Sequence, residues 1–320
     1  MTLRALVIGL GQIGMVSDLT LDPEFHVYSH ARAFYLHPSF ELVGGVDASA
    51  QRRDDFLHHF CVPAFENVSQ AIEALSPDVV AIAVPTEAHF KVLETVLDSG
   101  HPRAILCEKP LSNDIDEARK IVALCEKANV LLYVNYVRRA DLAVQEICRR
   151  LADGRIREPI KGVAWYSKGL FNNGSHFLDL LQYWLGELQS FDIVSAGRKW
   201  GEDPEPDFVA TFAKGIIHFL AAREEDFSHY TVELVTSSGR LRYDLGGERV
   251  SWQGAVASAS SPGYVVLNPD EERIPNGLTR IQWHLVDQLA AAISGEPAAI
   301  CSGSEALQTI EHLTTIKNSL

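Results

Sequence analysis

The feature that most constrains the fold of this chain is a glycine-rich loop, Gly9-Leu10-Gly11-Gln12-Ile13-Gly14. It directly follows an apolar run at residues 3–8 and precedes residues that can begin a helix. A strand, a G-x-G-x-x-G loop and a helix in this order are typical of a βαβ unit that holds a dinucleotide. We therefore predict that the loop, with Gln12 and Ile13 included, binds a pyrophosphate at a helix N-terminus. An ordinary glycine turn is the alternative.

Asp47 follows the second apolar run, where a carboxylate can accept hydrogen bonds from the adenosine ribose hydroxyls and would repel a 2′-phosphate. This position predicts NAD(H) as the cofactor, with an NADP(H) protein or a simple helix cap as alternatives. Asp47 lies further beyond Gly14 than the usual ~20 residues. Residues 15–40 must therefore contain an extended connection.

The first part of the chain alternates short apolar runs with amphipathic stretches, which predicts a parallel sheet covered by helices on both faces. We expect strands at residues 3–8, 41–46, 78–84, 103–107 and 130–135. The clearest helix is expected at residues 114–128, with Ser112 or Asn113 as its N-cap.

From about Lys161 the pattern changes to longer strand-like runs separated by glycines, which predicts an antiparallel sheet. The expected strands are 161–168, 207–213, 216–222 and 230–236, and two helices follow at 279–294 and 304–319. The predicted fold class is α/β: a Rossmann domain at residues 1–136, an α/β domain with an open, mostly antiparallel sheet at 137–278, and C-terminal helices at 279–320 that pack on the nucleotide domain.

The composition limits the classes of partner. The 320 residues carry a net charge of −14, which argues against binding to nucleic acid or to anionic lipid. The five cysteines are far apart and without metal-site spacing, so no metal is expected. The chain shows neither a signal peptide nor an apolar run of the ~18 residues that a membrane span needs. We expect a cytoplasmic protein that acts on a small molecule.

Three further motifs resemble those of the Gfo/Idh/MocA family of oxidoreductases, also called the glucose-fructose oxidoreductase family. Together with the glycine loop and Asp47, they are Val84-Pro85-Thr86, Cys107-Glu108-Lys109-Pro110 and Gly174-Ser175-His176. The similarity spans nearly the whole chain. It implies an NAD(P)-dependent oxidoreductase with a Rossmann domain followed by a substrate domain.

The resemblance implies that Lys109 lies beside the nicotinamide. In the family the peptide bond between this lysine and the following proline, here Pro110, is often cis. An ammonium there would stabilise the negative charge that develops on a carbonyl oxygen during hydride transfer. Glu108, Pro85, Thr86 and His89 are predicted to line the cofactor site. The alternatives are a surface lysine for Lys109 and a packing role for His89.

The helical spacing of the residues that follow places His176 in the first turn of a helix. Taken alone such a histidine is more often structural, but the resemblance makes it the group that exchanges a proton with the substrate hydroxyl. The family usually has an aspartate at the position of Asn172. Asparagine can hold a hydroxyl but cannot accept a proton as a base, so we assign Asn172 to substrate binding. Asn-Asn-Gly is also good turn chemistry, which is the structural alternative.

Tyr136 and Arg139 follow the fifth expected strand, where family members often place substrate contacts. An arginine there could bind an anionic group, and a salt bridge is the equal alternative for Arg139. The resemblance further implies a homodimer or homotetramer formed through the exposed face of the open sheet.

These observations predict an NAD(H)-dependent dehydrogenase or reductase acting on a secondary alcohol or ketone of a sugar. The Asn-Asn-Gly-Ser-His segment and the following Leu-Gln-Tyr-Trp resemble members that act on modified or nucleotide-linked sugars in polysaccharide biosynthesis. Two alternatives remain open. One is a family member with a non-sugar substrate, such as inositol, a dihydrodiol, an imine or a tetrapyrrole, and the other is a catalytically silent NAD(H)-binding regulator.

Overall fold

The computed structural model describes residues 2–320, and the chain divides into two compact units. The first unit contains the residues up to Ala140 together with Thr279–Gln308. The second contains Asp141–Leu278 and Thr309–Leu320. The division thus falls four residues after the expected end of the nucleotide domain. Residues 309–320 group with the second unit, which differs from the expectation that all of 279–320 packs on the first.

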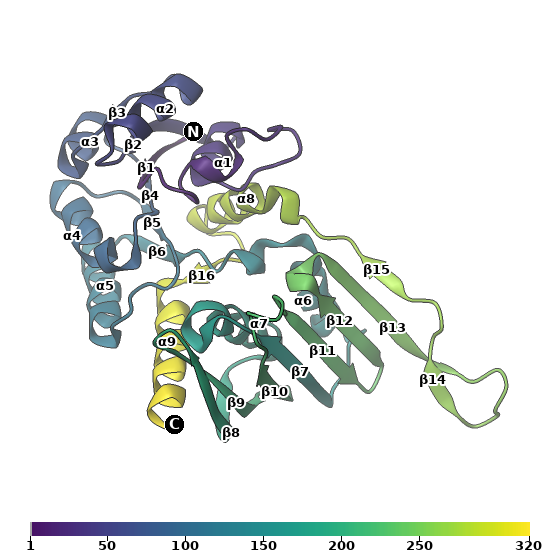
Figure 1. The fold of residues 1–320 in the computed structure, drawn as a ribbon. Coiled ribbons are helices and arrows are strands. Elements are labelled where there is room, and N and C mark those ends of the chain that lie inside the picture. Colours follow the sequence, from purple (N-terminus) through teal and green to yellow (C-terminus); the bar gives the residue numbers. More distant parts are fainter. Residues whose placement is uncertain (1) are drawn as a thin grey trace. The chain divides into compact units, whose positions relative to one another are not determined.

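The first unit is built on a sheet with the strand order β16-β6-β5-β4-β1-β2-β3 (Figure 1). Its parallel strands are β1 (Leu3–Ile8), β2 (Phe40–Val46), β3 (Ala64–Phe65), β4 (Val79–Ile82), β5 (Ala104–Cys107) and β6 (Leu131–Val134). Only β16 (Cys301–Ser302) is antiparallel to its neighbour. β4 and β5 are buried along their full length, as their continuous apolar sequences require. The predicted Rossmann sheet is confirmed.

Helices cover this sheet. They are α1 (His30–Leu36), α2 (Ala50–Phe60), α3 (Val68–Leu75), α4 (His89–Ser99), α5 (Ile115–Ala128) and α8 (Ile281–Ile293). Of these, α1, α2, α3 and α5 begin at side-chain N-caps. The N-cap of α5 is Asp114, whose side chain accepts a hydrogen bond from the Glu117 N–H. The expected cap at Ser112 or Asn113 is therefore corrected: Ser112 lies two residues before the N-cap, and its hydroxyl accepts from the Asp114 N–H.

A long excursion separates the glycine loop from α1. The Met15 N–H donates to the Gly11 carbonyl, as in a helix, and the chain then leaves this path. It returns at the start of α1, where the N–H groups of His30 and Ala31 donate to the carbonyls of Ile13 and Gly14. The predicted extended connection before Asp47 is thus confirmed, and the helix geometry resumes as though the intervening residues were absent.

The second unit contains a nine-stranded sheet with the order β14-β13-β12-β11-β7-β10-β9-β8, and β15 pairs with β13. The strands are β7 (Ile160–Tyr166), β8 (Leu188–Trp200), β9 (Asp203–Phe212), β10 (Gly215–Ala221), β11 (Thr231–Thr236), β12 (Gly239–Asp244), β13 (Arg249–Ala257), β14 (Val265–Leu267) and β15 (Glu272–Ile274). β7 and β10 are parallel, and the other pairs are antiparallel. The predicted mostly antiparallel sheet is confirmed.

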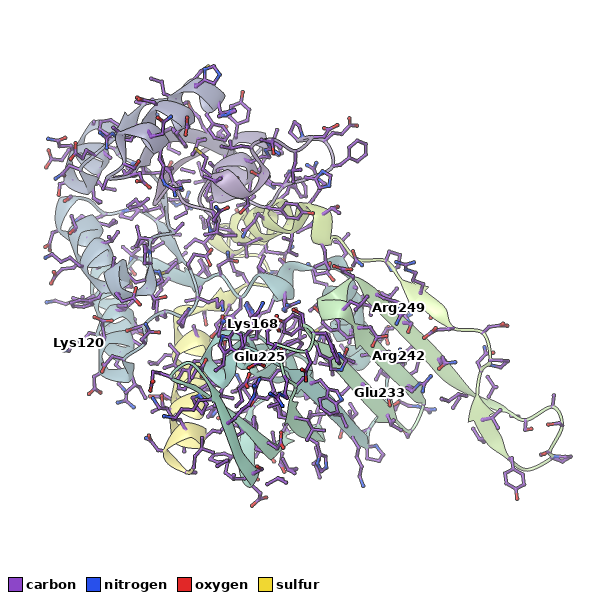
Figure 2. All side chains as sticks on the ribbon, viewed as in Figure 1. Lys120, Lys168, Glu225, Glu233, Arg242 and Arg249 are labelled. Carbon is purple, nitrogen blue, oxygen red and sulfur yellow. The ribbon has the colours of Figure 1, made fainter. Side chains whose placement is uncertain are left out.

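The two faces of this second sheet differ. One face packs against α6 (Leu142–Ala152), α7 (Ser175–Leu185) and the last turns of α9 (Gly303–Asn318), forming a core that includes Tyr166, Phe177 and Leu313. On the opposite face Trp165, Ile216 and Val235 are exposed. Charged side chains accompany them, and Figure 2 labels Glu233, Arg242 and Arg249 on β11, β12 and β13. The hairpin of β13 and β14 reaches beyond the neighbouring strands (Figure 1).

Candidate functional site

The glycine loop forms a cradle with room for a ligand above its second glycine. Gly9 has a φ of +93°, and a Cβ there would lie 2.6 Å from the carbonyl carbon of Ala83. A Cβ on Gly14 would lie 1.8 Å from the Gly9 oxygen. By contrast, the nearest atom to a Cβ on Gly11 is Nη1 of Arg52, at 3.8 Å. The first and third glycines therefore permit close packing, and the second leaves the backbone open to a phosphate.

A cavity of about 400 Å³ opens at the carboxyl ends of β1, β2 and β4. This is the edge at which open α/β sheets bind ligands, next to the point where the strand order reverses between β1 and β4. Of the residues predicted to bind cofactor, Gly9, Gly11, Asp47 and Pro85 line it. Gln12, Ile13, Gly14, Thr86, Glu108 and Lys109 do not line this cavity, so their cofactor contacts stay predictions.

Asp47 connects the end of β2 to the glycine loop. One carboxylate oxygen, Oδ2, accepts a hydrogen bond of 2.8 Å from the Leu10 N–H, and the other accepts one of 2.8 Å from the Ser49 N–H. The N-cap of α2 is Ser49 itself, whose side chain accepts from the Arg52 N–H. A carboxylate has about four lone-pair sites, so these two bonds leave acceptor capacity for ribose hydroxyls. The chemistry of the cavity fits a dinucleotide with a free 2′-hydroxyl.

Two charged residues of this cavity were not predicted. The Arg52 guanidinium lies against Gly11 and donates from Nη1 to the Leu10 carbonyl at 2.8 Å. Glu66 also lines the cavity, directly after the two-residue strand β3. Arg52 sits among charged residues that look like an ordinary solvent-facing helix surface, and β3 is too short to produce a period-two pattern. No signal in the sequence singled out either residue.

The segment that carries Lys109 lies at the end of β5. The Glu108 carboxylate accepts hydrogen bonds from Nε2 of His30 at 2.7 Å and from Nδ2 of Asn135 at 2.6 Å. Lys109 is half-buried, and the peptide bond between it and Pro110 is cis, as the resemblance implied. Glu108 is therefore engaged with neighbouring strands and helices of its own unit.

His89 corrects one expectation. It is fully buried, and its two ring nitrogens face the carbonyl oxygens of Val84 at 3.0 Å and of Leu111 at 3.2 Å. Both polar atoms of the ring therefore have main-chain neighbours within its own unit. His89 thus takes the packing role that was the alternative, because its ring has no exposed surface to offer a cofactor.

In the second unit, His176 lies in the first turn of α7 and is half-buried, which confirms its predicted place on a helix. Asn172 is exposed and belongs to η4 (Gly169–Gly174), a turn of π-helix that leads into α7. Its main-chain carbonyl accepts a hydrogen bond of 2.9 Å from the Ser175 hydroxyl. Asn172 and His176 therefore belong to one continuous helical segment, and their roles stay predictions.

Two carboxylates from β9 hold this π-helical turn. Asp203 accepts hydrogen bonds from the N–H groups of Phe171 and Asn172 at 3.0 Å, and Glu205 accepts from the Gly169 N–H at 3.1 Å. Burial raises the pKa of Asp203, and the hydrogen bonds from the turn oppose that shift. Sequence reasoning missed both residues, because they lie about 30 positions away in a strand.

Tyr136 and Arg139 are buried, with 2% and 3% of their surfaces exposed. Nη1 of Arg139 donates to Oε1 of Glu305 at 2.6 Å, which is the salt-bridge alternative stated above. The substrate contacts of both residues stay predictions. Within residues 2–320, no group of three or more His, Cys, Asp or Glu side chains is arranged to hold a metal ion, and no helix has the length and hydropathy to cross a bilayer.

Comparisons with known proteins agree with this description. Residues 3–136 match a family model described as an oxidoreductase family with an NAD-binding Rossmann fold. An inositol 2-dehydrogenase of Rhizobium meliloti is 26% identical over 267 residues, covering 79% of this chain and 71% of the relative. A D-apiose dehydrogenase of Paraburkholderia graminis is 26% identical over 316 residues, covering 89% and 82%.

Solved structures share the fold. A dehydrogenase from Bordetella pertussis, determined in complex with NADH and UDP-GlcNAcA, has a TM-score of 0.75 at 17% identity. The match covers 99% of this chain and 95% of that protein. At this identity the likeness concerns the fold of the two chains.

Proposed function

We propose that this chain is a member of the Gfo/Idh/MocA family and that it transfers hydride between NAD(H) and a secondary alcohol or ketone of a sugar, because residues 3–136 match the NAD-binding oxidoreductase family model and sugar-type dehydrogenases are among its relatives. The observation that carries this proposal is the cradle at Gly9–Gly14 with Asp47 at its side, in a cavity of about 400 Å³. NAD supplies the hydride acceptor or donor when bound. The residues of the chain then account for binding, charge stabilisation and proton transfer.

Lys109 is proposed to stabilise the charge on the reacting oxygen. The residue follows the end of β5, at the edge of the sheet where open α/β sheets bind ligands. A donor aimed at a developing alkoxide is worth roughly 10²-fold or more in rate, because the charge it meets is larger in the transition state than in the ground state.

His176 is proposed to take the proton from the alcohol during oxidation and to return it during reduction. Its place in the first turn of α7 leaves the ring half-buried. Asn172, one turn earlier, is proposed to hold a substrate hydroxyl through its exposed amide. Since an amide cannot act as the base, the proton route in this chain passes through His176 or Lys109.

The finer proposal is a modified or nucleotide-linked sugar, made in a pathway of polysaccharide synthesis. It is supported by the Asn-Asn-Gly-Ser-His segment, and the dehydrogenases of inositol and D-apiose among the relatives support a polyhydroxylated substrate in general. A panel that contains free sugars, inositols, UDP-linked sugars, an imine and a dihydrodiol, followed by NADH absorbance, tests both levels. Turnover of an imine or a dihydrodiol alone would overturn them.

The Lys109→Ala variant is measured on the same panel. It should lose turnover by about 10²-fold or more while it binds NADH nearly as tightly as the parent. A parent protein that binds NADH and turns over no member of the panel would instead support the alternative of a silent regulator.

We also propose that the exposed face of the second sheet forms a homodimer or homotetramer. Trp165, Ile216 and Val235 are 36%, 39% and 53% exposed on adjacent strands, and such clusters are uncommon on monomers. Light scattering of the parent and of Ile216→Lys with Val235→Lys tests this. A parent that is monomeric at micromolar concentration would overturn it.

A further inference from the structure

The short segment from Glu108 to Leu111 is tied at both ends by buried histidines. His30 meets the Glu108 carboxylate through Nε2 at 2.7 Å, and His89 meets the Leu111 carbonyl through Nδ1 at 3.2 Å. Lys109 and Pro110 are the only residues between these two tied positions. Both histidines are fully buried, and each is the first residue of a helix, α1 and α4.

The tie at Glu108 has strong donors. Its carboxylate is mostly buried, with 16% of the side chain exposed, and it receives both the His30 and the Asn135 hydrogen bonds on Oε1. An ionised carboxylate only accepts hydrogen bonds, so Nε2 of His30 is the donor in this contact. Hydrogen bonds to a charged acceptor are about twice as strong as neutral ones, so this contact holds the end of β5 firmly.

The tie at Leu111 reaches the cofactor cavity. The other nitrogen of His89, Nε2, faces the Val84 carbonyl at 3.0 Å, and Val84 lines the cavity. A neutral imidazole carries one N–H, so His89 donates to one of these two carbonyls and packs against the other. Its ring thereby lies between the cavity wall after β4 and the main chain just beyond Lys109. A shift of the main chain on either side of Lys109 would therefore disturb a contact of His30 or of His89.

We propose that His30 and His89 are positioning residues that hold the segment carrying Lys109 at the end of β5. Neither side chain reaches the reacting atoms: His30 acts through Glu108, and His89 acts through the main chain of Leu111. The consequence for the reaction rests on the role of Lys109 in the proposed function. The positioning of Lys109 by the two histidines does not depend on the proposed function, because it concerns only how firmly Lys109 is held.

The test measures the reactivity of the Lys109 amine in the full chain without any substrate. The protein is labelled with a trace of acetic anhydride, and the acetylation of Lys109 is compared by peptide mass spectrometry with that of Lys120. Lys120 is exposed on α5 and serves as an internal reference (Figure 2). His30→Leu and His89→Leu should each raise the ratio of Lys109 to Lys120 labelling by about threefold or more, because the segment opens more often and exposes the Lys109 amine to the reagent.

Conservative variants and a matched control separate positioning from general loosening. His30→Gln and His89→Gln keep an N–H donor and should return the ratio close to that of the parent. The control is His37→Leu: His37 is 3% exposed and faces an Asp287 oxygen at 3.3 Å, just beyond the other end of α1. It should lower the melting temperature and leave the ratio unchanged.

An unchanged ratio in the folded Leu variants would overturn the proposal, and so would an equal change in His37→Leu. If the Leu variants do not fold, Asn135→Ala, which removes only the second donor to Glu108, provides the same readout. With a sugar that the parent turns over, the Leu variants should lose about tenfold or more in kcat at little cost in NADH affinity. If the parent turns over no sugar but the Leu variants still change the labelling ratio, the positioning role stands and only the proposed function is overturned.

Discussion

The Asp47 carboxylate accepts a hydrogen bond of 2.8 Å from the main-chain N–H of Leu10, which joins the end of β2 to the glycine loop that follows β1. One side chain thus has two consequences. It holds the loop in place, and it sets negative charge at the wall of the cavity.

Replacing Asp47 should therefore affect both cofactor choice and cofactor affinity. For Asp47→Ser we expect NADH to bind about tenfold more weakly, since a charge-assisted hydrogen bond to ribose is lost. The affinity for NADPH should rise relative to that for NADH, because the negative charge that repels a 2′-phosphate is removed. Fluorescence titration with both nucleotides measures the ratio. Asp54→Ser, on the exposed surface of α2, is the control; a parent ratio in Asp47→Ser would contradict the assignment.

The second and third glycines of the loop should respond differently to the same substitution. Gly11→Ala places its Cβ 3.8 Å from the nearest atom, so stability should hardly change while NADH binding weakens. Gly14→Ala places its Cβ 1.8 Å from the Gly9 oxygen and should cost roughly 2 kcal/mol or more of unfolding free energy. Thermal melting and NADH titration of both variants give the comparison. Equal losses of stability would show that the second glycine is packed as tightly as the third.

Asp203 should make the second unit sensitive to pH in a defined direction. Because burial raises its pKa above 3.8, the folded protein keeps a proton that the unfolded chain has already lost in the window just above that value. Its contribution to stability therefore falls as the pH rises through this window. Asp203→Asn should flatten the change. Urea unfolding at several pH values between about 4 and 6 measures it, and parallel curves for the two proteins would rule the effect out.

The Arg139–Glu305 pair should act in the opposite sense. Burial alone would raise the pKa of Glu305, but the charge and hydrogen bond of Arg139 lower it below its usual value. The resulting stability is present at neutral pH and disappears as the pH falls through the lowered pKa. Glu305→Gln should thus cost roughly 1 kcal/mol at pH 7, a value limited by the partial exposure of the carboxylate, and less in acid. Urea unfolding at pH 7 and pH 4 tests the difference.

Local sequence was enough to predict the sheet of the first unit, because its strands are short apolar runs and its glycine loop has one conformation that fits. The strand at Leu3–Ile8 has the expected bounds, and the helix at Ile115–Ala128 begins within one residue of its expected start. The excursion before α1 was deduced from the spacing of Gly14 and Asp47. Its path was not, since it depends on contacts such as those of the buried Asp18 with Tyr28 and Ser29.

The amino-acid sequence by itself determined the class of fold, the phosphate cradle and the acidic residue beside it, because each of these depends on a few neighbouring residues and on backbone geometry. Only the tertiary structure decided which side chains support the site. His30 meets Glu108, Arg52 lies against Gly11, and Asp203 holds the turn of Asn172. These partners come from separate elements, and their contacts exist only once the sheets bring distant strand ends together.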